Sequence, residues 1–179
     1  MSLFVLGDPH LSFGVPDKPM DIFSGWENYQ EILRENWLKT VTADDTIVLA
    51  GDISWGMTLA EAKADFAFIH ALPGQKIILK GNHDYWWNSM KKMTAFFEEN
   101  QFDSLHLLHN NCYSYGEYAI CGTRGWVNMP GEASDAKVLA REQQRLKVSL
   151  EAAAKLGLKP DEKLVVSVWG SLGAQHMND

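Results

Sequence analysis

The chain has 179 residues, a formal net charge of −7, 46% hydrophobic residues and 22% charged residues. This composition excludes a disordered chain, and the length favours one domain over two large ones. No apolar run approaches the roughly 20 residues of a membrane-spanning helix, the first residues do not resemble a signal peptide, and the negative charge argues against a general nucleic-acid binder. We therefore expect a soluble, cytoplasmic protein with a single domain over residues 1–179.

Three short apolar runs in the first half of the chain predict buried strands, at residues 3–7, 46–50 and 76–80. A turn-forming glycine stands at the end of each run or directly after it. The strands are therefore expected to stop abruptly, and polar segments begin where they stop.

Helices are predicted between these strands and after the third. The first is expected to open at a capping box, with Ser24 as the N-cap and Glu27 three residues later. The second is expected to run from Thr58 to about Leu72, and the third to cover about 87–99.

The second half of the chain has a different pattern. Strand-like runs lie near 104–108, 112–115 and 118–122, a long amphipathic helix is predicted over about 134–156, and a last strand over 164–169. Strand–helix alternation followed by an antiparallel-looking section indicates an α/β fold built in layers.

Polar residues that can carry chemistry follow each of the first three predicted strands. They are Asp8 and His10 after the first, Asp52 after the second, and Asn82, His83 and Asp84 after the third. Ligands of parallel α/β sheets collect beyond the carboxyl ends of the strands, so these residues are expected to meet at one rim. Each motif alone is explained by ordinary turn and cap chemistry; their repeated placement after three strands favours a site.

The residue types suit divalent metals. Asp8 and His10 are two positions apart, and in an extended backbone, which Pro9 favours for the residue before it, both side chains point the same way. Asp52 could bridge two cations, and Asn82 offers a neutral carbonyl oxygen. Two metals about 4 Å apart can clamp a phosphoryl group and generate hydroxide at neutral pH.

The three motifs, D-x-H, G-D and G-N-H-D, resemble the signature of the calcineurin-like metallophosphoesterase superfamily. The resemblance covers about the first half of the chain, and the segments 51–56 and 81–87 look like a subgroup of predicted bacterial phosphohydrolases. It implies a metallophosphoesterase-like four-layer α/β/β/α sandwich of two mixed sheets, and metals of the Mn, Fe or Zn type.

The same resemblance implies a role for each motif residue. Asp8 and His10 would bind the first metal, Asp52 both metals, and Asn82 the second. His83 would stabilise the phosphoryl group or protonate the leaving oxygen, and Asp84 would orient the His83 ring.

The chain departs from the family pattern towards its end. Trp169 stands where a histidine is expected, the G-H-x-H block is missing, and His176 lies in a tail, 170–179, that we expect to be disordered. We therefore expect a truncated domain that lacks its C-terminal strands, a weak second metal site, and an exposed sheet edge that favours self-association.

Arg124, after a predicted strand, has two interpretations. Its guanidinium could clamp a phosphate, or it could form a surface ion pair. On the long helix, Arg141, Glu142 and Arg145 are expected to form a solvated face.

Large aromatic residues also lie beside the motifs, at Trp55 and at 85–87. They could line a substrate site, although aromatics next to buried strands more often belong to a core.

The function predicted from sequence is a metal-dependent phosphoesterase that uses metal-activated hydroxide on a phosphate mono- or diester, such as a phosphorylated small molecule. Loss of the C-terminal histidines is expected to impair this chain. The alternative is a catalytically weak or inactive module that keeps the fold for binding or assembly. An exonuclease is disfavoured because the sequence has no basic track.

Overall fold

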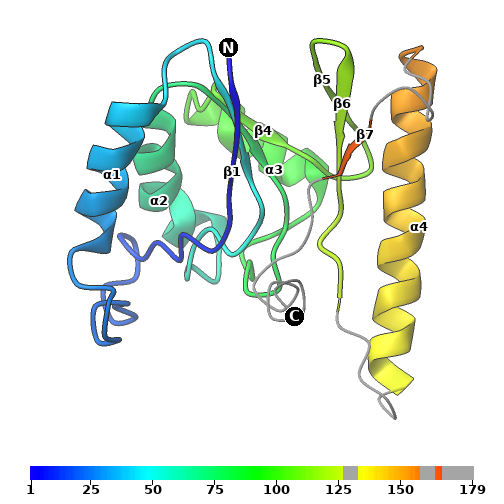
Figure 1. Ribbon diagram of the computed structural model, residues 1–179. Helices are drawn as coiled ribbons and strands as arrows, with labels where there is room; N and C mark the ends of the chain where they lie inside the picture. The colour runs from blue at the N-terminus through cyan, green and yellow to red at the C-terminus, as the bar shows by residue number, and fades with distance from the viewer. Residues whose placement is uncertain (127–132, 158–163, 167–179) are drawn as a thin grey trace.

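The structure is a computed structural model and describes residues 1–126, 133–157 and 164–166. Residues 1–107 contain a four-stranded sheet made of β1 (Leu3–Leu6), β2 (Thr46–Leu49), β3 (Gln75–Ile78) and β4 (Leu105–Leu107), in that order and all parallel (Figure 1). The register pairs Leu6 with Leu49 and Leu49 with Ile78. Because these last residues are level, the loops after β1, β2 and β3 leave the sheet along one line.

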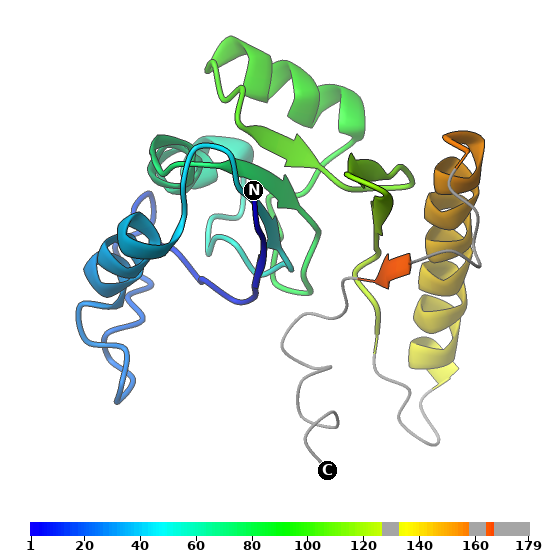
Figure 2. The ribbon, with the colours of Figure 1, turned by 45° about the horizontal axis from the view of Figure 1, so that its top comes forward.

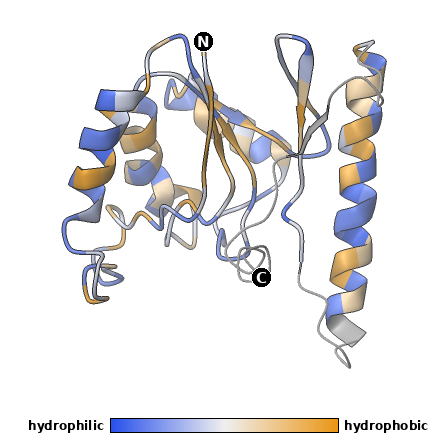
Figure 3. Cartoon of the chain, in the orientation of Figure 1, coloured by the Kyte–Doolittle hydropathy of each residue, from blue (hydrophilic) through white to orange (hydrophobic). Residues whose placement is uncertain are grey.

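Three helices cover one face of this sheet: α1 (Tyr29–Thr40), α2 (Leu59–Ala71) and α3 (Met90–Glu99). Their buried residues include Phe66 and Met93, which pack with Leu49 and Ile78 of the sheet in one large apolar core. The hydropathy colouring shows the central strands as hydrophobic along much of their length, as expected for strands buried on both faces (Figure 3).

A second, smaller sheet packs against the other face. It contains β5 (Tyr113–Tyr115), β6 (Tyr118–Cys121) and β7 (Leu164–Val166); β5 and β6 are antiparallel, and β6 and β7 are parallel. A core that includes Val48, Ile77 and Ile120 joins the two sheets. The long helix α4 (Ala133–Lys155) covers the outside of the second sheet, as the rotated view also shows (Figure 2).

The expected four-layer α/β/β/α arrangement is therefore confirmed, with one difference. The second sheet is mixed, whereas the first is wholly parallel over the part of the chain that the structure describes. The last predicted strand, 164–169, is described only as β7, so Trp169 and the tail 170–179 with His176 lie outside the described residues. Among the described helices, none is long and apolar enough to cross a membrane.

Two helix starts differ from the sequence prediction. The helix α1 begins at Tyr29 rather than near Ser24, so the predicted capping box is wrong. Asn28 adopts a left-handed conformation (φ 54°) that stops the helix from extending backwards, and the Glu27 carboxylate accepts a hydrogen bond from the backbone N–H of Gly25. The helix α3 begins at Met90, three residues later than predicted, because the Ser89 hydroxyl caps it.

Candidate metal centre

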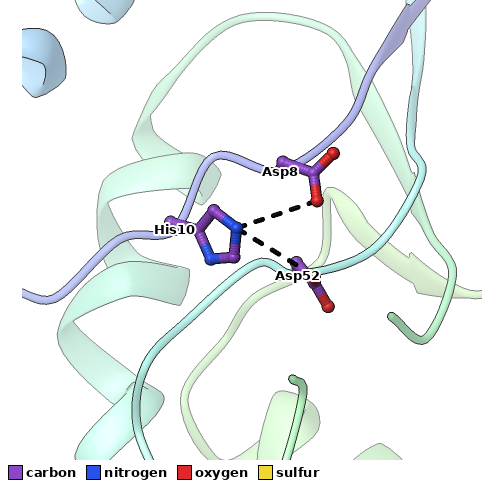
Figure 4. A group of neighbouring side chains, drawn as sticks. All are labelled: Asp8, His10 and Asp52. Atoms are coloured by element: carbon purple, nitrogen blue, oxygen red, sulfur yellow. Dashed lines mark ion pairs between the residues drawn. The ribbon is translucent and has the colours of Figure 1, made fainter. Parts of the chain in front are cut away.

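The loops after β1 and β2 bring two carboxylates and an imidazole together. Asp8, His10 and Asp52 each offer one ligand atom, and these atoms lie within 4.8 Å of one another. The Nε2 atom of His10 is 3.7 Å from Asp8 Oδ1 and 4.0 Å from Asp52 Oδ2, as the dashed lines mark in Figure 4. The convergence of the first two motifs, expected from their placement after parallel strands, is therefore present in the structure.

The backbone at these three residues is left-handed, whereas an extended backbone was expected at Asp8. Asp8, His10 and Asp52 all have positive φ values, of 55°, 44° and 52°. A left-handed conformation costs a non-glycine residue roughly 1–2 kcal/mol, so the surroundings must impose it. At His10 the N–H donates to the Asp52 carbonyl over 3.0 Å, and the carbonyl accepts from the Tyr29 hydroxyl over 2.7 Å.

Two glycines allow the loops after β2 and β3 to touch. Gly51 has a φ of 103°, and a Cβ atom there would lie 2.5 Å from the Cα of Gly81. A Cβ atom at Gly81 would in turn overlap the carboxylate of Asp52. The Asp52 side chain, which is fully buried, therefore occupies space that exists only because residue 81 has no side chain.

The third motif joins the group through His83. The backbone N–H of His83 donates to Asp52 Oδ1 over 2.8 Å, and its Nδ1 atom lies 3.1 Å from Asp52 Oδ2. Asn82 lies one step further out, with Nδ2 3.0 Å from His83 Nδ1. Residues of all three motifs thus lie around the Asp52 carboxylate, with Asn82 reached through His83.

Asp84 has a different place from the one expected. Its Oδ2 atom accepts from the N–H groups of Asp52 (2.9 Å) and Gly81 (2.7 Å), and its Oδ1 atom accepts from Ile53 N–H (2.8 Å) and the Trp86 indole (2.9 Å). Neither oxygen contacts the His83 ring in the described part of the chain. Burial raises the pKa of the Asp84 carboxyl to about 6, although four donors favour its charged form. Asp84 therefore ties the loops after β2 and β3 to each other.

Asp65, on α2, has a similar task that the sequence analysis missed. It is fully buried; Oδ1 accepts from the N–H of Phe13 over 2.8 Å, and Oδ2 accepts from the Ser54 hydroxyl. It thereby joins the segment after His10 to the segment after Asp52. A signal was present, because Asp65 stands among the apolar residues Ala62, Phe66 and Ile69 on the buried side of the helix.

Aromatic rings surround the imidazoles. His10 stacks on Trp55, with ring centroids 4.8 Å apart and an interplanar angle of 16°, and Trp55 also lies 5.3 Å from the His83 ring. Trp86, in contrast, is 1% exposed and packs edge-on against Phe66 in the core. Trp55 therefore belongs to the site and Trp86 to the core. Burial lowers the pKa of His10, with Asp52 opposing this effect, and the lowered pKa favours the neutral ring that can bind a metal.

Arg124 is placed beside the group rather than in it. Its side chain is 13% exposed and stacks on Trp126 at 4.4 Å, and its Nη2 atom is 3.9 Å from Glu142 Oε1. Its buried Nε atom has no hydrogen-bond partner within the described residues. Burial lowers the pKa of the guanidinium, while Glu142 and Asp52 act in the opposite direction, so Arg124 lies within electrostatic reach of the site.

The chain resembles one known protein family over almost its whole length. The model of the family described as calcineurin-like phosphoesterase matches residues 1–176. A crystal structure of a protein of unknown function from Aquifex aeolicus is similar, with a TM-score of 0.48 and 18% sequence identity over 98% of this chain and 86% of that chain. No curated protein matches the chain.

Proposed function

Because this chain belongs to the calcineurin-like phosphoesterase family, we propose that it is a metal-dependent hydrolase of phosphate mono- or diesters. The observation that carries the proposal is the convergence of Asp8, His10 and Asp52, whose ligand atoms lie within 4.8 Å of one another. The family supports the substrate class, and the geometry supports the residues that we assign to the site.

The residues fit a divalent cation. Two carboxylates and a neutral imidazole suit Mn, Fe or Zn, the metals that we propose here. The missing Cβ at Gly81 leaves the Asp52 carboxylate room at the centre of the group. A bound cation of this kind supplies Lewis acidity and activates water for attack on phosphorus. We propose that a second cation would bind weakly, since Asp52 and Asn82 supply it with oxygen donors only.

The chain's own residues have separate tasks in this proposal. His83, whose side chain is 37% exposed, is held against Asp52 and can give a proton to the leaving oxygen. Arg124 would stabilise negative charge on the phosphoryl oxygens, as a guanidinium matches them in shape and charge. Trp55 fixes the ring plane of His10 by stacking and also contacts the His83 ring, which is tilted by 43° relative to it.

The test is hydrolysis of p-nitrophenyl phosphate and bis-(p-nitrophenyl) phosphate with added Mn²⁺. We expect Asp52→Asn to lower kcat/KM by on the order of 100-fold or more, because it removes the charge shared by all three motifs. Asp44→Asn, at an exposed position, is the matched control.

Calorimetric titration of Mn²⁺ into both proteins completes the test. Equal hydrolysis by the wild type and Asp52→Asn would overturn the proposal. Absence of hydrolysis in the wild type, together with Mn²⁺ binding that Asp52→Asn abolishes, would instead favour the module that only binds or assembles.

A further inference from the structure

A cluster of cationic side chains surrounds one buried carboxylate on α4. Glu142 is 1% exposed, and its Oε1 atom lies 2.6 Å from Arg145 Nη1, 3.5 Å from Arg141 Nε and 3.9 Å from Arg124 Nη2. Its Oε2 atom accepts from the Thr123 hydroxyl over 2.6 Å. The expectation of a solvated face is therefore wrong for Glu142, because the segment after β6 covers it.

Lys80, the residue two positions after the end of β3, adds a fourth positive charge. Burial lowers the pKa of its ammonium, and Arg124 and Arg145 lower it further, against the opposing effect of Asp84 and Glu142. Lys80 forms no hydrogen bond or ion pair within the described part of the chain. Three guanidiniums thus surround one carboxylate, and the ammonium of Lys80 lies within electrostatic reach of them, in a protein whose formal net charge is −7.

This cluster borders the candidate metal centre. Lys80 directly precedes Gly81, whose backbone N–H is bound by Asp84. Gly122 packs so closely on Leu79, the residue after β3, that a Cβ atom there would lie 2.6 Å from Leu79 Cδ2. This contact holds Arg124, two residues later, near the loop that begins at Lys80. Cations of the cluster therefore stand beside the loop that carries Asn82 and His83.

The neighbouring acids do not neutralise the cluster. Asp84 has both oxygens occupied by four N–H donors, and Asp52 belongs to the proposed metal group. Glu142 has two oxygens, whereas each guanidinium carries five N–H donors. The arrangement therefore fixes several cationic donors in place and leaves part of their hydrogen-bonding capacity for an external anion.

We propose that Lys80 and Arg145 bind a second phosphate group of the substrate, next to the phosphate that is hydrolysed and that Arg124 contacts. The inference rests on the proposed function and narrows it to phosphoesters whose leaving group carries a phosphate of its own. Guanidiniums fit this task because they bind phosphate in a bidentate manner, and Lys80 adds a mobile point charge.

The experiment compares ligands with one and two phosphonate groups on alkyl chains of one to three carbons. Their binding is measured by calorimetry in excess Mn²⁺, on the wild type, on Lys80→Gln, and on Lys91→Gln as a control on α3. We expect the wild type to bind at least one bisphosphonate about tenfold more tightly than the matching monophosphonate. Lys80→Gln should remove most of this preference and leave monophosphonate binding unchanged, and Lys91→Gln should change neither.

Two results would overturn the inference: no preference at any chain length, or a preference that survives in Lys80→Gln. Hydrolysis of p-nitrophenyl phosphate, which has one phosphate, separates this failure from failure of the proposed function. If that hydrolysis persists and depends on Asp52 while the preference is missing, the second-phosphate site alone is wrong. If the preference is present without hydrolysis, the hydrolase proposal alone is wrong.

Discussion

Two regions of this molecule each bury a carboxylate, and they treat it in opposite ways. At the rim of the parallel sheet, Asp84 accepts four hydrogen bonds from neutral N–H groups. On α4, Glu142 accepts from one hydroxyl and is surrounded by guanidiniums. The first arrangement fixes the course of the backbone, whereas the second fixes positive charges. Burial of an acid therefore does not by itself indicate what the acid does; the chemistry of its hydrogen-bond donors does.

The largest loss of stability is expected for Asp84→Asn. Each Asp84 oxygen accepts from two N–H donors, so an amide nitrogen in either position would face two donors and could accept from neither. We expect the free energy of unfolding to fall by about 3 kcal/mol, measured by urea denaturation followed by circular dichroism. Asp44→Asn should leave the free energy of unfolding unchanged. A loss below about 1 kcal/mol for Asp84→Asn would show that the four hydrogen bonds of Asp84 do not hold the two loops together.

A smaller effect is expected at Asp65, which has only two donors. Burial raises the pKa of its carboxyl to about 6, above the ordinary value of about 3.9. Between these two pH values the folded state holds a proton that the unfolded state has lost, so stability falls as the pH rises. Relative to Asp65→Asn, the wild type should therefore lose about 2 kcal/mol of unfolding free energy from pH 4 to pH 6. If the difference in unfolding free energy between the two proteins does not change with pH, the two hydrogen bonds of Asp65 fully offset the cost of burying its charge.

The smallest effect is expected for Glu142→Gln. The amide oxygen can still accept from Arg145, and the amide N–H can donate to the Thr123 oxygen, so no donor is left facing another. We expect a loss of about 1 kcal/mol or less in the same urea experiment. A loss as large as that of Asp84→Asn would show that Glu142 stabilises the fold as strongly as Asp84 does. The two buried carboxylates would then not differ in their tasks.

Much of the fold could be predicted because its signals are local. Short apolar runs ending in glycine gave the strands, and parallel pairing then placed Asp8, His10 and Asp52 at one rim. The capping box at Ser24 failed for an equally local reason, the left-handed Asn28. What the sequence could not reveal depends on contacts between distant segments.

Asp84 and Glu142 illustrate this limit. The Asp84 carboxylate accepts a hydrogen bond from the backbone N–H of Asp52, 32 positions away. Every residue except proline has such an N–H, so the sequence cannot show which one the carboxylate binds. Glu142 was interpreted from helix spacing, which pairs it with Arg141 and Arg145 but cannot show that Thr123 lies over it. For the same reason the sequence pointed to His83 as the partner of Asp84, although the structure gives that carboxylate four other donors.

The left-handed backbone at Asp8, His10 and Asp52 sets folding and chemistry in conflict at the same positions. Glycine adopts this conformation without steric cost, so it is the replacement that chain folding alone would favour there. It is also the replacement that removes every ligand atom. Selection for stability therefore favours glycine at these three positions, whereas selection for activity favours the metal ligands. In a lineage that no longer needs the activity, we expect substitutions towards glycine at these positions.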